Sequence, residues 1–208
     1  MNQRARQTVP WVFQAIAAAS IALLALSANS QSAAPLPVTM ADTLRPIPGA
    51  ALDAVIKPFP RLKFPSESDT LSSFSNLENK VFRPDSGTGP FPAIVLVPTC
   101  GGTTNRPEIR ERTKEFLGAG YLVLVVENYV PRGQRNCRNQ VVTGALVWRD
   151  VVDALAHLHT MKEVDKSRVY QVGYSIGAWS AAALSSRAIN AYFGSNLRFR
   201  ASVGWYGS

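Results

Sequence analysis

Residues 169–177 read Val-Tyr-Gln-Val-Gly-Tyr-Ser-Ile-Gly, a short β-branched run that ends in the pattern G-x-S-x-G. The residues that follow, 176–189, are small and helix-compatible. A serine on a tight strand-to-helix turn takes an unfavourable backbone conformation that raises its hydroxyl above the sheet. Two residues before and after Ser175 only small side chains fit, and Gly173 and Gly177 meet that requirement. The motif predicts an accessible serine between a buried strand and a helix.

A serine placed in this way is a candidate nucleophile, because a helix N-terminus favours developing negative charge. The backbone N–H of Ile176 is a natural donor to an oxyanion. A second donor is expected from the loop after an earlier strand, Pro98-Thr99-Cys100-Gly101-Gly102, where the N–H of Cys100 or of its neighbour faces the substrate carbonyl. A less specific interpretation stays open: an idle serine on a glycine-flanked turn, and a glycine pair that only reverses the chain.

The rest of the chain alternates strand-like and helix-like segments. Apolar and β-branched runs predict strands, and amphipathic stretches bounded by Pro and Gly predict helices. The expected strands are 61–64, 79–82, 93–97, 121–126, 169–172 (after a turn at 165–167) and 201–205, and the expected helices are 107–118, 144–161 and 176–189. Continuous apolar runs are typical of parallel strands covered by helices on both faces. The pattern predicts a three-layer α/β sandwich with a mostly parallel sheet.

Composition narrows the class of protein. The chain has 208 residues, 46% of them hydrophobic and 17% charged, which fits one globular domain and excludes disorder, collagen and coiled coil. Two cysteines are too few for a disulfide-framework miniprotein or a Cys-rich zinc module. The net charge is +8, but the basic residues are scattered, with Arg132, Arg135 and Arg138 as the densest group. No nucleic-acid partner is expected, because such a face needs clustered basic residues.

The N-terminus has the pattern of an export signal. Arg4 and Arg6 precede an apolar stretch, 11–26, and small and polar residues follow it. Its 16 residues fall short of the ~20 that span a bilayer, so a cleaved signal peptide, 1–30, is favoured over an anchor helix. We expect a periplasmic or secreted protein without a stable membrane partner. A Pro/Ala/Ser-rich lead-in, 31–59, precedes the predicted folded domain, 60–208.

From the turn at Pro84 to Gly207 the chain resembles the dienelactone hydrolase family of α/β-hydrolases. The shared motifs, in order, are T-C-G-G at 99–102, G-Y-L-V-L-V-V at 120–126, P-R-G at 131–133, W-R-D-V at 148–151, G-Y-S-I-G at 173–177 and S-V-G-W-Y-G at 202–207. The resemblance implies an α/β-hydrolase fold and the cleavage of a small carboxylic ester, lactone or thioester, with no metal and no organic cofactor. Founding members use cysteine as nucleophile, whereas Ser175 resembles the serine-bearing esterase relatives.

The resemblance also implies a residue that binds substrate. In the family, an arginine on the loop after the strand contacts a substrate carboxylate, and Arg132 occupies that place by motif. Arg132 is therefore the candidate substrate anchor. A solvated loop arginine is the alternative.

An activated serine needs a histidine base and an acid, which follow it along the chain in this fold. Residues 176–208 contain no Asp, Glu or His. His157 and His159 lie two residues apart on a predicted helix and face directions about 200° apart, so we expect surface or packing roles for them. Asp150 and Asp153 are expected to cap or form ion pairs.

Two interpretations follow. The chain is the N-terminal portion of a longer hydrolase, lacks the last strands and helices, and is inactive alone; or it is a non-catalytic α/β-hydrolase-like exported binding protein. The intact serine turn favours the first, because a strained turn has little structural use once chemistry is lost.

Cys100 and Cys137 follow successive strands of the predicted sheet. In the implied fold these strands are neighbours and both loops leave the carboxyl edge, so a disulfide is geometrically reasonable, and export supplies an oxidising compartment. A nucleophilic Cys100 and free buried thiols are the alternatives.

Overall fold

A mostly parallel sheet is the centre of the part of the chain that the structure describes, which in this computed structural model is residues 49–70, 77–104 and 106–206. The strand order is β1-β2-β4-β3-β5-β6, and the one antiparallel pair is β2 with β4. The strands are β1 (Asp69–Thr70), β2 (Val81–Arg83), β3 (Phe91–Val97), β4 (Leu122–Val125), β5 (Val164–Tyr174) and β6 (Ala201–Trp205). The predicted mostly parallel sheet is confirmed.

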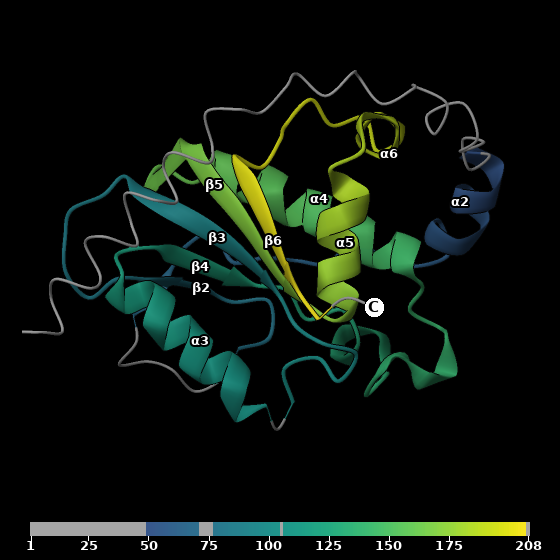
Figure 1. The fold of residues 1–208 in the computed structure, drawn as a ribbon, viewed down its shortest axis with the longest axis horizontal. Coiled ribbons are helices and arrows are strands. Elements are labelled where there is room, and N and C mark those ends of the chain that lie inside the picture. Colours follow the sequence, from purple (N-terminus) through teal and green to yellow (C-terminus); the bar gives the residue numbers. More distant parts are fainter. Residues whose placement is uncertain (1–48, 71–76, 105, 207–208) are drawn as a thin grey trace, which may run out of the picture. The chain divides into compact units, whose positions relative to one another are not determined.

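Helices cover both faces of the sheet (Figure 1). α3 (Pro107–Gly118) covers one face, and α4 (Gly144–Thr160) and α5 (Ile176–Leu184) cover the other. The two shorter helices are α2 (Gly49–Ile56), which packs on α4, and α6 (Arg187–Tyr192), which lies next to α5. On one face, Ile109 and Leu117 of α3 pack in a cluster with Leu96 of β3. On the other, α4 packs in a cluster with Val95 and Leu124. Burial of both faces explains the continuous apolar runs and confirms the three-layer sandwich.

Four sequence-based expectations need correction. Residues 61–64 are not a strand; Phe64 packs its ring on His157 with centroids 5.5 Å apart. The strand β1 lies instead in the polar connection after them. β5 starts at Val164, so it includes the expected turn at 165–167. The expected helix 176–189 is two helices, because the Asn190 side chain donates to the carbonyls of Leu184 and Ser186 at the break.

The folded part begins before residue 60. Helix α2 buries Leu52 and Ile56 in a cluster with Ala145 of α4. The Arg149 guanidinium donates to the carbonyls of Ile56 at 3.1 Å and Phe59 at 2.9 Å. Residues 49–59 thus belong to the domain, not to an extended lead-in. The expected signal peptide, 1–30, lies outside the described residues, among which no helix is long and apolar enough to cross a membrane.

A buried hydrogen-bond chain fixes α5 on β5. Gln171 Nε2 donates to Ser180 Oγ at 2.7 Å, and Ser180 Oγ donates to the Gly177 carbonyl at 2.7 Å. Both side chains are fully buried. These two hydrogen bonds therefore fix the first turn of α5 on β5.

The variant Ser180→Ala should lose about 1–3 kcal/mol of unfolding free energy, because the Gln171 amide stays buried and loses its acceptor. Urea unfolding followed by circular dichroism measures this. Ser185→Ala at the C-cap of α5 is the control, since Ser185 is exposed and should change stability by less than about 0.5 kcal/mol. Equal losses in the two variants would contradict the assignment.

Candidate active site

Ser175 lies on the turn between β5 and α5 with φ 53° and ψ −111°. A non-glycine residue at positive φ is strained and persists only where its surroundings hold it. Here the Ser175 N–H donates to the Trp205 carbonyl at 3.0 Å, and its carbonyl accepts from the N–H groups of Ala178 and Trp179 at 2.9 and 3.1 Å. The predicted strand–turn–helix placement of Ser175 is present.

The two glycines of the motif stand where a side chain has no room. A Cβ on Gly173 would lie 2.1 Å from the Gly177 carbonyl oxygen, and a Cβ on Gly177 would lie 2.3 Å from the Val97 carbonyl oxygen. Both neighbours are backbone atoms, which cannot swing aside. The absence of side chains at these positions brings the start of α5 against the end of β3.

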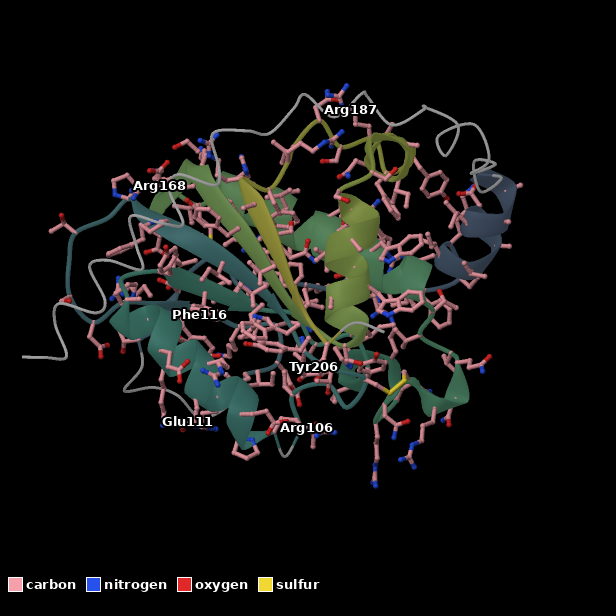
Figure 2. All side chains as sticks on the ribbon, in the orientation of Figure 1. Arg106, Glu111, Phe116, Arg168, Arg187 and Tyr206 are labelled. Atoms are coloured by element: carbon pink, nitrogen blue, oxygen red, sulfur yellow. A yellow bond between two sulfur atoms is a disulfide. The ribbon has the colours of Figure 1, made fainter. Side chains whose placement is uncertain are left out.

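A cavity of about 1190 Å³ opens at this end of the sheet, and Ser175 borders it. The loop after β3 contributes Thr99, Cys100 and Gly101, and Tyr206 borders it after β6. Figure 2 shows Tyr206 and Arg106 at this end of the sheet, with Arg168 and Arg187 at the other. A second hollow of about 1030 Å³ runs along β6 and α5, but Ser175 does not border it.

The two cysteines form a disulfide that joins the loops after β3 and β4, with Cα atoms 5.0 Å apart (yellow in Figure 2). The Cys137 N–H also donates to the Cys100 carbonyl at 3.0 Å. The predicted bridge is confirmed, and the alternatives of a nucleophilic Cys100 and of free thiols are wrong. The bridge fixes one side of the loop that borders Ser175.

Arg132 is not in the cavity. Its guanidinium makes two 2.8 Å hydrogen bonds to the Asp150 carboxylate and a 2.7 Å bond to the Asn128 carbonyl, and its side chain is 2% exposed. Neither a substrate anchor nor a solvated arginine describes it, because both of its Nη groups donate inside the protein. Burial raises the pKa of Asp150, and the hydrogen bond from Arg132 opposes that shift.

The cationic side chains that border the cavity are Arg106, Arg135 and Arg138. Arg106 directly precedes α3, and Arg135 and Arg138 follow Arg132 on the loop after β4. The signal for them in the sequence was the local density of arginine between 132 and 138. Their neighbour Glu108 also borders the cavity and pairs with Arg106 at 3.4 Å.

The histidines of α4 do not border the cavity of Ser175. His157 Nε2 lies 2.8 Å from the Pro65 carbonyl oxygen, and burial lowers the pKa of His159, with a further contribution from Lys166. The expected packing role is confirmed for His157, as are the ion pairs of Asp150 with Arg132 and of Asp153 with Arg61. The described residues contain no group of three potential ligands that could hold a metal ion.

Comparison with protein-family models matches residues 77–208, more than half of the chain, to the dienelactone hydrolase family. The chain belongs to the dienelactone hydrolase family. This match confirms the family that the motifs between Pro84 and Gly207 predict.

Three solved structures resemble this family member. A putative dienelactone hydrolase from Klebsiella pneumoniae is 22% identical, with 61% of this chain and 52% of that one covered and a TM-score of 0.45. A dienelactone hydrolase-like promiscuous phosphotriesterase from metagenomic libraries is 22% identical, with 59% and 50% covered and a TM-score of 0.45. Esterase 2 of Thermogutta terrifontis, phosphoramylated by tabun, is 19% identical, with 50% and 40% covered and a TM-score of 0.41.

The chain spans about half of the length of the first two of these proteins and 40% of the third. A search of curated proteins gave no match.

The variant Gly173→Ala should destabilise this dienelactone hydrolase family member by about 3 kcal/mol, because the new methyl group overlaps the Gly177 carbonyl and forces the turn to move. Thermal unfolding measures the change. Gly118→Ala is the matched control, since nothing lies within 4 Å of its Cβ position. A Gly173→Ala protein as stable as the control would show that the close approach is absent.

The variant Arg132→Met should cost about 3 kcal/mol of unfolding free energy, because it leaves the buried Asp150 carboxylate with only the longer, 3.5 Å ion pair to Arg149. Denaturant unfolding measures the loss. In the control Arg112→Met, the ion pair with Glu115 is half exposed and should contribute less than about 1 kcal/mol. Losses of similar size in the two variants would contradict the buried ion pair.

Proposed function

We propose that this protein hydrolyses a small carboxylic ester, lactone or thioester by nucleophilic attack from Ser175. The observation that carries the proposal is the backbone of Ser175, whose strained φ of 53° places it at the edge of a cavity at the carboxyl end of the sheet. Strain of this kind is concentrated at functional sites. Membership of the dienelactone hydrolase family agrees with a hydrolytic enzyme.

In the proposed reaction, the Ser175 hydroxyl attacks the substrate carbonyl and the carbonyl oxygen becomes an oxyanion. Two backbone N–H groups stabilise it: that of Ile176, the first residue of α5, and that of Cys100, whose loop borders the same cavity. The positive end of the helix dipole adds to the first donor. Removal of one such donor typically costs a factor of about 10²–10³ in kcat.

The serine also needs a base to accept its proton and an acid to orient that base. Ser175 has no histidine among the described residues that border its cavity, and residues 176–208 contain no His, Asp or Glu. In our proposal both groups come from sequence beyond residue 208, in the order acid and then histidine. Residues 1–208 then contribute the nucleophile and the two oxyanion donors.

The charge around the cavity favours an anionic substrate. Arg106, Arg135 and Arg138 border it, against the single carboxylate Glu108 among the described lining residues. A guanidinium binds a carboxylate through paired hydrogen bonds. These arginines replace Arg132 as candidates for the substrate contact.

We further propose that the protein is exported to the periplasm or secreted, which the N-terminal signal pattern and the disulfide support.

A fluorophosphonate probe tests the nucleophile. The full-length protein should be labelled on the peptide that carries Ser175, and the variant Ser175→Ala should lose the label completely. Ser185→Ala removes an exposed hydroxyl from the end of the same helix segment and should label like the unmodified protein. Absence of labelling in the full-length protein would favour the alternative, a non-catalytic binding protein.

The same variant tests the origin of the base. The 208-residue chain alone should hydrolyse p-nitrophenyl acetate no faster than its Ser175→Ala form, because the proton of the serine has no acceptor. A difference of about tenfold or more would contradict a base from beyond residue 208.

A further inference from the structure

Glu127 is a buried carboxylate at the end of β4 that the reaction proposed above does not use. Its side chain is 0% exposed, and among the described residues no Lys, Arg or His forms an ion pair with it. A buried charge without such a partner is costly unless hydrogen bonds satisfy its oxygens. The partners that satisfy Glu127 therefore indicate what the residue does.

Those partners come from the two loops that border the cavity. Oε2 accepts hydrogen bonds from the Thr103 N–H at 2.5 Å and the Thr103 hydroxyl at 2.8 Å. Oε1 accepts from the N–H groups of Tyr129 at 2.8 Å and Val130 at 3.4 Å. One oxygen thus holds the loop after β3, and the other holds the loop after β4.

The backbone of Glu127 is itself fixed, by a side chain from the segment before β2. Asn79 Oδ1 accepts from the Glu127 N–H at 2.9 Å, and Asn79 Nδ2 donates to the Glu127 carbonyl at 3.2 Å. Gly102 lies directly on the carboxylate, with φ +61°, and a Cβ there would be 2.4 Å from Oε2. Glycine is required at this position by both the positive φ and the contact.

The loop that contributes the Cys100 N–H is held at both ends. Cys100 is joined to Cys137 by the disulfide, and the Gly102 N–H closes a turn onto the Thr99 carbonyl at 2.9 Å. The next residue, Thr103, is held by Glu127. An oxyanion donor contributes to catalysis only when its direction is fixed before the reaction, because its reorientation would otherwise add to the barrier.

We propose that Glu127 is a positioning residue: through Thr103 it holds the loop 99–103 so that the Cys100 N–H points at the oxyanion. This inference rests on the proposed function of Ser175. No bond is made or broken at Glu127, which keeps its four hydrogen bonds throughout the reaction. A carboxylate suits this place because it accepts several N–H and O–H donors at once.

If Glu127 had a purely structural role, loss of its contacts would lower the stability of the protein and leave the chemical step unchanged. A positioning role would instead lower kcat, so kcat and KM are measured separately. The variant is Thr103→Val in the full-length protein, with p-nitrophenyl acetate as substrate. It removes the hydroxyl donor to Oε2 and keeps the backbone donor. We expect kcat to fall about tenfold with KM within about twofold, and Thr103→Ser to restore kcat, since loss of a fixed donor raises only the transition state.

The matched control is Thr113→Val. Thr113 is also fully buried, and its hydroxyl donates to the Ile109 carbonyl at 2.8 Å within α3, away from the loop. This variant should keep the unmodified kcat at a similar loss of melting temperature. A kcat that is unchanged in Thr103→Val, or equally lowered in Thr113→Val, would overturn the positioning role while Ser175-dependent turnover stands.

Amide hydrogen exchange gives a readout that needs no turnover. The N–H groups of Cys100 and Gly101 should exchange about tenfold faster in Thr103→Val than in Thr113→Val, because only the former loosens the loop. Equal exchange rates of these two N–H groups in the two variants would overturn the proposal that Glu127 holds the loop 99–103 through Thr103. Full-length protein without Ser175-dependent turnover would overturn the proposed function, and the positioning role with it.

Discussion

The contact between Gly177 and the Val97 carbonyl is the constraint on which the site depends. β3 and β5 are parallel neighbours in a register that pairs Val97 with Gly173, so the two strands end level. With no side chain at Gly177, the first turn of α5 lies against the end of β3. Ser175 is thereby brought to the same cavity as the loop that leaves β3, and any larger residue at 177 would separate them.

Buried polar side chains hold the surroundings of this contact. Gln171 and Ser180 fix the first turn of α5 on β5. Glu127 joins the loops after β3 and β4. Asp150, on α4, holds the loop after β4 through its ion pair with Arg132. Each of these groups carries a cost of burial that hydrogen bonds offset. The loops at the carboxyl edge are therefore fixed by directional bonds, whereas the sheet beneath them is held by apolar packing.

This difference between directional hydrogen bonds and apolar packing explains which parts of the fold and of the site could be predicted from the sequence. The serine turn and the central strands were predictable because steric limits and apolar runs are local signals. The role of Arg132 was not, since its partner Asp150 lies 18 residues along the chain on another element. The segment 61–64 was misjudged because short apolar alternation does not show whether a neighbouring strand exists. Glu127 was missed, although an acidic residue directly after a buried strand was a usable signal.

The disulfide between Cys100 and Cys137 has a consequence for how the cavity admits a ligand. It ties together the two walls formed by the loops after β3 and β4, with their Cα atoms 5.0 Å apart, so these walls cannot spread. Tyr206, which follows β6 and is two-thirds exposed, borders the same cavity but belongs to neither of the two bridged loops. Under the proposed function, a larger ligand is therefore expected to enter on the side of Tyr206 rather than between the two bridged loops.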